Sequence, residues 1–120
     1  MNTKILVIDN TLCNWSRCQC LREEGYHVDT VLTPDDGLHK LTGQQPDVII
    51  VQEKPGAQSW QLCEQIRHLS SSPLMVISPN ASVETSARAI RAGADYFMRH
   101  YFGPLEFSAR VKSLLRRSSN

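Results

Sequence analysis

The sequence predicts an α/β fold with a doubly wound, five-stranded parallel sheet and helices on both of its faces. Short apolar runs rich in β-branched side chains alternate along the 120-residue chain with longer segments of helical character. Fully apolar runs are typical of strands buried on both faces, as in parallel sheets. Regular alternation of such strands with helices, joined by right-handed crossovers, gives this architecture in a chain of ordinary single-domain length.

The first half of the chain predicts three strands and two helices. The strands are expected at 4–8, 27–31 and 47–51, and the helices at 11–24 and 33–42. Gly25 stands where the first helix must end, and Thr33 followed by Pro34 is a typical start of the second. Pro46 then breaks the chain before the third strand.

The second half predicts two more strands and three more helices. The helices are expected at 59–69, 82–92 and 103–117, and the strands at 74–78 and 96–98. Helix 82–92 carries Val83, Ala87, Ile90 and Ala94 at core spacing, so these side chains are expected to face the sheet. No linker divides residues 1–120, which are expected to form one domain, with 117–120 as the start of a linker to an output domain.

Composition and charge exclude several classes of protein. A net charge of +1 favours neither nucleic acid nor an anionic membrane as a partner. No apolar run approaches the roughly 18 residues of a membrane-spanning helix, and the N-terminus does not resemble a signal peptide. Cytoplasmic location is therefore expected, with the four cysteines as reduced thiols, because their spacing fits no zinc or redox pair. The four histidines show no metal-ligand spacing either.

The residues that follow the strands are the candidates for function. Ligands and chemistry sit outside the carboxyl ends of the strands in this architecture, at the point where the strand order reverses. The residues at these ends are Asp9, Asn10, Gln52, Glu53, Ser78, Pro79, Arg99 and His100.

Several segments resemble, in the right order, the receiver domain of bacterial response regulators (CheY-like topology). Lys4-Ile5-Leu6-Val7-Ile8-Asp9-Asn10 resembles the first receiver strand, and Pro46-Asp47-Val48-Ile49-Ile50-Val51 the strand that carries the phosphorylated aspartate. Pro73-Leu74-Met75-Val76-Ile77-Ser78 resembles the strand ending in Thr or Ser, and 93–102 the segment that normally ends Lys-Pro-Phe. The resemblance implies a signalling module and not an enzyme. Members of this family accept a phosphoryl group from a histidine kinase.

The resemblance assigns a role to each strand-end residue. Asp9 matches the first acid of the family, and Asn10 the second, which binds the metal. Gln52 stands at the acceptor position, Ser78 matches the hydroxyl that senses the phosphate, and His100 replaces the lysine. Hydrogen bonds among Asp9, Gln52, Ser78 and His100 are expected to hold this site in one state.

This residue set predicts a degenerate phosphorylation site. A glutamine cannot form an acyl phosphate, and a neutral histidine supplies no permanent positive charge at pH 7. Magnesium prefers carboxylate oxygens, so at most a weak site at Asp9 is expected, with no other metal and no cofactor. The chain is therefore interpreted as a pseudo-receiver that works without phosphorylation.

Protein contacts are the expected output. The resemblance places a switching aromatic at Phe97 and a dimerisation face on the last two helices and the strand between them. The residues expected on that face are Arg88, Arg91, Arg99, Tyr101, Arg110 and Lys112. The partner would be a kinase, an output domain or a second copy. The basic last helix is interpreted as a solvated face rather than a nucleic-acid site.

Four alternatives stay open at this point. The domain could be a functional receiver with an unconventional acceptor, or a flavodoxin-like or nucleotide-binding protein, although the first loop lacks the glycines of a phosphate cradle. Glu53 could mimic a phosphorylated side chain permanently, but an exposed loop acid beside Lys54 is the simpler interpretation. Trp15 is either buried by a rotated first helix or exposed as part of a contact surface.

Overall fold

The computed structural model describes residues 3–9, 15–53, 60–79, 82–98 and 103–118, with only the main chain of 15–17 and 118. Five strands and five helices alternate along these residues, as the sequence predicts. The strands are β1 (Lys4–Ile8), β2 (His27–Val31), β3 (Val48–Gln52), β4 (Leu74–Ile77) and β5 (Tyr96–Met98). The helices are α1 (Trp15–Glu23), α2 (Pro34–Gly43), α3 (Trp60–Leu69), α4 (Val83–Arg91) and α5 (Pro104–Ser118). The start expected for the first helix, 11–14, and the side chain of Trp15 lie outside this description.

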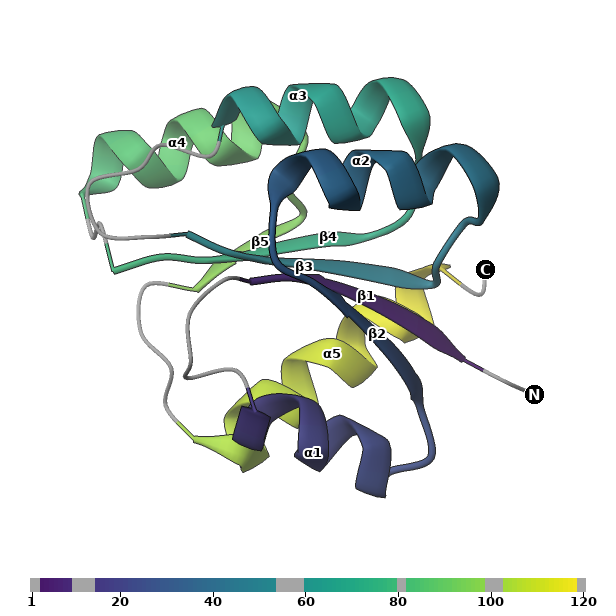
Figure 1. The fold of residues 1–120 in the computed structure, drawn as a ribbon. Helices are drawn as coiled ribbons and strands as arrows, with labels where there is room; N and C mark the ends of the chain where they lie inside the picture. The colour runs from purple at the N-terminus through teal and green to yellow at the C-terminus, as the bar shows by residue number, and fades with distance from the viewer. Residues whose placement is uncertain (1–2, 10–14, 54–59, 80–81, 99–102, 119–120) are drawn as a thin grey trace.

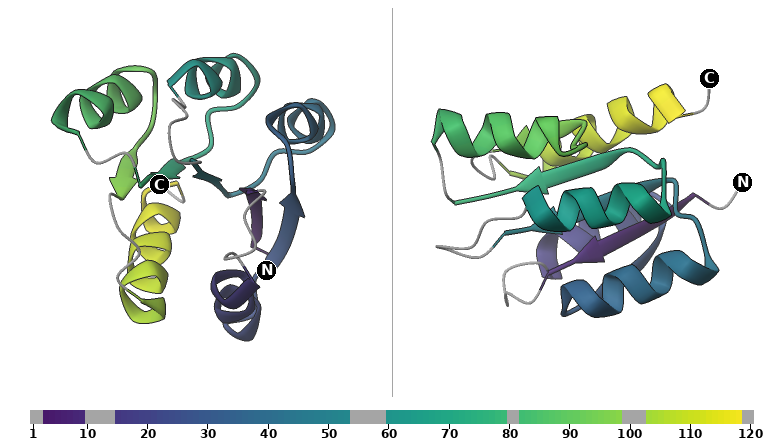
Figure 2. Two further views of the ribbon diagram at one scale, coloured as in Figure 1. Left: turned by 60° about the vertical axis from the view of Figure 1, so that its left-hand side comes forward. Right: turned by 90° about the horizontal axis from the view of Figure 1, so that it is seen from above.

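The strands form one parallel sheet in the order β2-β1-β3-β4-β5. Helices α2, α3 and α4 cover one face of it, and α1 and α5 cover the other (Figures 1 and 2). The strand order reverses between β1 and β3, so the carboxyl ends of these two strands form the switch point of the sheet.

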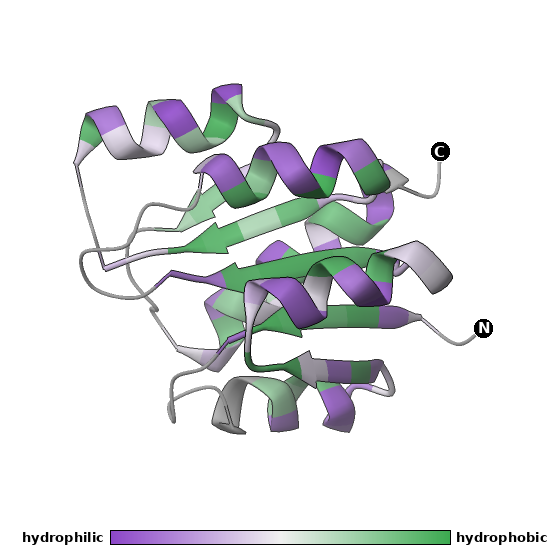
Figure 3. Ribbon diagram, turned by 45° about the horizontal axis from the view of Figure 1, so that its top comes forward, coloured by the Kyte–Doolittle hydropathy of each residue, from purple (hydrophilic) through white to green (hydrophobic). Residues whose placement is uncertain are grey.

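Two hydrophobic clusters lie on opposite faces of the sheet because successive side chains of a strand alternate between its faces. On the α1/α5 side, Ile50 belongs to the same buried cluster as Phe107 and Val111. On the other side, Ile49 belongs to the same cluster as Ile66. Figure 3 shows the consequence in the colouring: the strands are mostly apolar, and the helices alternate between apolar and polar segments.

Local side-chain chemistry fixes two helix starts. Thr33 Oγ1 accepts a hydrogen bond from the backbone N–H of Asp36 at 3.1 Å, and Ser82 Oγ accepts one from Thr85 N–H at 3.0 Å. These caps satisfy backbone donors that a helix leaves unpaired in its first turn.

The side of α4 that contacts the sheet differs from the expectation. Val83 and Ile90 were expected in the core, but they are 73% and 45% exposed, whereas Ala89 is buried. Helical spacing identifies an apolar stripe without saying which side of the helix is covered. Since α4 lies at the outer end of its row of helices, over the short edge strand β5, only a narrow strip of it is covered (Figure 2).

Candidate functional site

Three polar side chains are buried at the carboxyl ends of β1, β3 and β4. Asp9, Glu53 and Ser78 are 1%, 3% and 1% exposed. The backbone N–H of each donates to the neighbouring strand, so each residue continues the hydrogen-bond ladder beyond the strand end. The acceptors are the carbonyl oxygens of Val31, Ile77 and Met98, at 2.9, 2.7 and 3.0 Å. The sheet itself therefore positions these residues, as the switch-point argument predicts.

Strand alternation divides these residues between the two sides of the sheet. Asp9 follows Val7 by two residues and Gln52 follows Ile50 by two, and both Val7 and Ile50 face α1 and α5. Asp9 and Gln52 accordingly line one small void on that side together with Phe107. Glu53 and Ser78 follow Val51 and Val76, which face α2–α4. The side chains of Asp9 and Gln52 thus lie on the α1/α5 side of this edge, whereas those of Glu53 and Ser78 lie on the α2–α4 side.

Gln52, at the acceptor position of the resemblance, uses its amide to bind main chain. Its Nε2 donates to the carbonyl oxygen of Glu53 at 3.1 Å and to that of Ile77 at 3.2 Å. A half-buried amide with two such acceptors ties the end of β3 to the end of β4. This arrangement suits a structural role, because an amide oxygen or nitrogen is no nucleophile for phosphoryl transfer.

Glu53 is not the exposed loop acid that the sequence favours. Its side chain is buried, and its Oε1 accepts a hydrogen bond from Ser78 Oγ at 2.7 Å. The expectation failed because Glu53 continues the ladder of β3 for one residue beyond the apolar run, with its side chain on the inner side. Counting alternate positions from Ile49 and Val51 would have indicated this orientation.

The other expected site residues are placed only in part. Asn10, His100, Arg99 and Tyr101 lie outside the described ranges. The hydrogen bond of Ser78 to Glu53 brings in a residue that the expected four-residue set did not include. Among the residues that the structure describes, no group of three or more His, Cys, Asp or Glu side chains is arranged as metal ligands.

The residues expected on the dimerisation face fall on different sides of α4 and α5. Arg110 lies over the ring of Tyr96 in β5, at 5.0 Å from its centroid. Lys112 lies on the α1 side of α5, where its Nζ is 3.5 Å from Glu24 Oε2. Phe97 is half-buried and packs against the core cluster under α2–α4.

On α4, the apolar and the basic residues point in different directions. Arg88 lies 4.9 Å from the ring centroid of Trp60 and therefore faces α3. Ile90 lies about 200° further around the helix, on the side away from α3 and toward the β5 edge. Val83 is two turns before Ile90 on the same side, and Arg91 is exposed. The exposed stripe that can accept a partner is thus apolar, with Val83 and Ile90 as its members.

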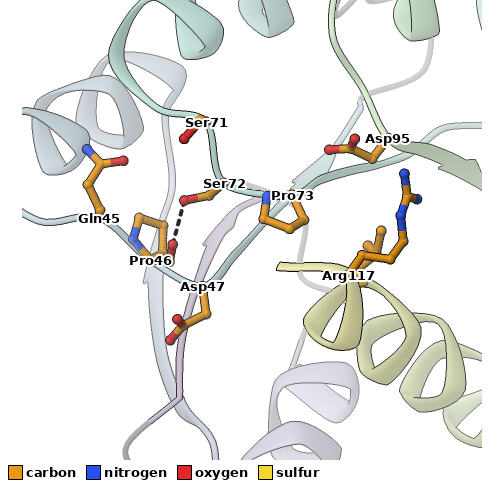
Figure 4. A pocket seen from close by; sticks show the side chains of 9 residues that line it. Gln45, Pro46, Asp47, Ser71, Ser72, Pro73, Asp95 and Arg117 are labelled. Atoms are coloured by element: carbon orange, nitrogen blue, oxygen red, sulfur yellow. Dashed lines mark hydrogen bonds between the residues drawn. The ribbon is translucent and has the colours of Figure 1, made fainter. Parts of the chain in front are cut away.

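A cavity of about 450 Å³ lies at the opposite edge of the sheet, before the amino ends of β3, β4 and β5 (Figure 4). Its lining is mostly polar and includes Asp47, Ser72, Asp95 and Arg117. Ser72 Oγ donates to the carbonyl oxygen of Pro46 across its floor. The cavity is remote from the carboxyl ends of the strands, where Asp9 and Ser78 lie.

The cysteines that the structure describes are free thiols, namely Cys18, Cys20 and Cys63. Burial raises the pKa of the Cys63 thiol from 9.0 to about 11. Burial and the carboxylates of Glu24 and Glu23 also raise the pKa of Cys20. Protonated thiols are poor nucleophiles, so neither side chain is activated as a catalytic nucleophile at neutral pH.

Within the described part of the chain, none of the helices combines the length and the apolar character that crossing a bilayer requires.

Comparison with solved structures gives the same fold. A CheY-like receiver domain protein from Methanospirillum hungatei superposes with a TM-score of 0.90 at 24% identity, covering 99% of this chain and 98% of that one. A two-component response regulator from Clostridium difficile gives a TM-score of 0.89, again at 24% identity, with 99% and 100% of the two chains covered.

Two relatives that are similar in sequence are transcriptional regulatory proteins. The alkaline phosphatase synthesis transcriptional regulatory protein PhoP of Bacillus subtilis is 31% identical over 125 residues, covering 98% of this chain and 50% of PhoP. The transcriptional regulatory protein ResD of B. subtilis is 29% identical, with 98% and 50% covered. This chain therefore spans about half the length of these relatives.

The family model of the response regulator receiver domain matches residues 5–112, which include four of the strands and all of β1 except Lys4. On this match, and on the parallel sheet with its polar carboxyl edge, the chain belongs to the response regulator receiver domain family.

Proposed function

We propose that this receiver domain signals without phosphorylation of an aspartate and acts through protein contacts. The observation that carries the proposal is Gln52 at the acceptor position, with its amide bound to the main-chain oxygens of Glu53 and Ile77. Phosphoryl transfer to a receiver needs a carboxylate nucleophile and cations that neutralise the phosphoryl oxygens. Gln52 provides no such carboxylate, and His100 provides no permanent charge.

Magnesium binding is expected to be weak in this domain. The family holds the ion with carboxylates, whereas the sequence here offers Asp9 with the amides of Asn10 and Gln52. Glu53 is a second buried acid, but strand alternation places it on the other side of β3, where Ser78 binds it. This donor set does not fit the ion well, so no step of the proposed mechanism depends on it.

The partner is proposed to be another protein: a kinase, an output domain or a second copy of this chain. Exposed apolar side chains on α4 support this proposal, because Val83 and Ile90 are 73% and 45% exposed. The relatives PhoP and ResD are named as transcriptional regulatory proteins. By analogy, we propose that this domain controls an output such as transcription from the cytoplasm, without touching nucleic acid itself.

Incubation with acetyl phosphate and Mg²⁺, followed by intact-mass measurement, tests the proposal. The wild-type mass should stay unchanged, whereas phosphorylation would add about 80 Da. The matched control carries Asn10→Asp, Gln52→Asp and His100→Lys, which restores the family residues and should gain the adduct. An adduct on wild-type protein at Glu53 or any other residue would instead establish a receiver with an unconventional acceptor.

A further inference from the structure

We propose that the Glu53 carboxyl group is a built-in ligand of the Ser78 hydroxyl, which holds the end of β4, and through it the start of α4, in a single state. Glu53 then acts as a positioning residue for α4. This inference rests on the proposed function, because it explains how a receiver without an acceptor aspartate could keep one defined conformation.

The two side chains meet in a site that excludes water. Glu53 is 3% exposed and Ser78 is 1% exposed. The distance of 2.7 Å between Ser78 Oγ and Glu53 Oε1 is typical of a good O–H···O hydrogen bond. A buried acid is costly to keep without hydrogen-bond donors, so the Ser78 hydroxyl stabilises the buried carboxyl group of Glu53.

The main chain fixes the carboxyl group before it meets Ser78. The backbone N–H of Glu53 donates to Ile77 O at 2.7 Å, and the carbonyl oxygen of Glu53 accepts from Gln52 Nε2 at 3.1 Å. The same Nε2 also donates to Ile77 O at 3.2 Å. The N–H of Glu53 is thus held by β4, and its carbonyl oxygen is held by the Gln52 side chain, which also binds β4. The edge of the sheet presents the Glu53 side chain.

Ser78 connects this edge to α4. It lies directly after β4, and Ser82, only four residues later, caps the first turn of α4 through its bond with Thr85 N–H. Because Ser82 follows Ser78 by only four residues in the sequence, we expect a displacement of Ser78 to reach the start of α4. Since α4 bears the exposed Val83 and Ile90, the group bound to Ser78 influences how this stripe is presented.

An internal ligand changes the switching behaviour. By the family resemblance, the hydroxyl at position 78 would receive a phosphoryl oxygen only after phosphorylation. In this chain an acidic oxygen is supplied by the residue next to the acceptor position and is always present. A ligand that is always present keeps the population in the state it prefers. The domain is therefore held in one state by its own sequence.

Hydrogen exchange of the α4 amides in a double-mutant cycle tests this proposal. Glu53→Met and Ser78→Ala should each increase the exchange rate of the α4 amides about tenfold, because each removes one partner of a buried hydrogen bond. The double variant should exchange within about twofold of either single variant, since both act through the same bond. Ser78→Thr keeps the hydroxyl and should exchange like the wild type.

Glu64→Met is the matched control, because it makes the same change at an exposed position of α3 and should leave α4 unchanged. Additive effects in the double variant, or wild-type exchange in Glu53→Met, would overturn the inference. Should the double variant not fold, the comparison of Glu53→Met with Glu64→Met decides, and equal rates would overturn it. An acetyl-phosphate adduct would refute the proposed function alone, whereas missing coupling without an adduct would refute this inference alone.

Discussion

Arg67 of α3 donates through Nη2 to Asp95 Oδ2 at 2.8 Å, and the same oxygen accepts the backbone N–H of Leu74 at 2.8 Å. The guanidinium also donates to the carbonyl oxygens of Ser72 and Gly93, at 2.6 and 2.9 Å. One side chain thus joins α3 to the segments that precede β4 and β5. These contacts lie at the amino edge of the sheet, away from the candidate site.

Asp95→Ala should lower the free energy of unfolding by about 1–3 kcal/mol, because it leaves a half-buried guanidinium and a backbone donor without their shared acceptor. Urea denaturation at pH 7 measures the change. Glu64→Ala, at an exposed helical position, should change stability by no more than about 0.5 kcal/mol. Equal stability of the Asp95 variant and wild type would show that water replaces these hydrogen bonds.

Gly93→Ala should be more destabilising than the same change at Gly25. Both glycines have a positive φ, +123° and +94°, which costs an alanine about 1 kcal/mol. At Gly93 a Cβ would also overlap the side chain of Arg67, whereas no atom lies within 4 Å of a Cβ at Gly25. Thermal unfolding of both variants measures the difference. Gly43→Ala has open space and no positive φ, so it should be neutral or stabilising.

Cys63 should resist alkylation in the folded protein, whereas Cys20 should react first. Burial raises the pKa of Cys63 to about 11, and the chain covers its sulfur as well. Cys20 is only partly covered, although its pKa is also raised. Labelling with N-ethylmaleimide at pH 7, followed by peptide mass mapping, gives the order. Rapid labelling of Cys63 without denaturant would contradict its burial.

Alkaline pH should also destabilise the fold through Cys63. Its folded-state pKa, about 11, lies above the ordinary value of 9.0 that the unfolded chain should have. The stability contribution is complete below pH 9 and is lost as the pH rises toward 11. Cys63→Ala should remove this part of the decline in stability between pH 9 and 11, measured by urea denaturation. An unchanged decline in that variant would assign it to other groups.

Self-association, where it occurs, should depend on the apolar stripe of α4. Ile90→Glu places a charge among the exposed apolar groups and should weaken a dimer by at least about 30-fold, as expected for loss of a central contact. Sedimentation velocity over a range of concentrations measures this. Leu69→Glu, at an exposed apolar position of α3, is the control and should associate like the wild type. A wild-type chain that stays monomeric at high micromolar concentration would exclude a second copy as the partner.

The architecture could be predicted from the sequence because the strands are recognisable as apolar runs. The runs that include Ile49 and Leu74 are apolar throughout, as is typical of strands that are covered on both faces. The side of α4 that meets the sheet was not predictable in this way. Both the stripe of Val83 and Ile90 and the small Ala89 are compatible with helical spacing, and the position of α4 over an edge strand decides between them.

The sequence predicts polar residues at the carboxyl edge of the sheet, but it does not predict the hydrogen bonds that they form there. Asp9 and Ser78 are buried there, as expected of residues at a switch point. The bond from Ser78 to Glu53 depends on how far the ladder of β3 continues, and that is decided by the pairing of Glu53 N–H with Ile77. Such pairing is a tertiary property. Strand alternation indicates the side of the sheet on which Glu53 would lie, but the sequence does not show that the ladder extends to it.

Gln52 and Glu53 are consecutive residues whose side chains lie on opposite sides of one sheet. Because the alternation has a period of two, the loss of a single codon at this strand end would exchange the two sides. The acid would then occupy the place of the amide, and Ser78 would lose its internal ligand. The loss of one codon therefore separates a domain that supplies its own acid to Ser78 from one whose acid lies beside Asp9 on the α1/α5 side of the sheet.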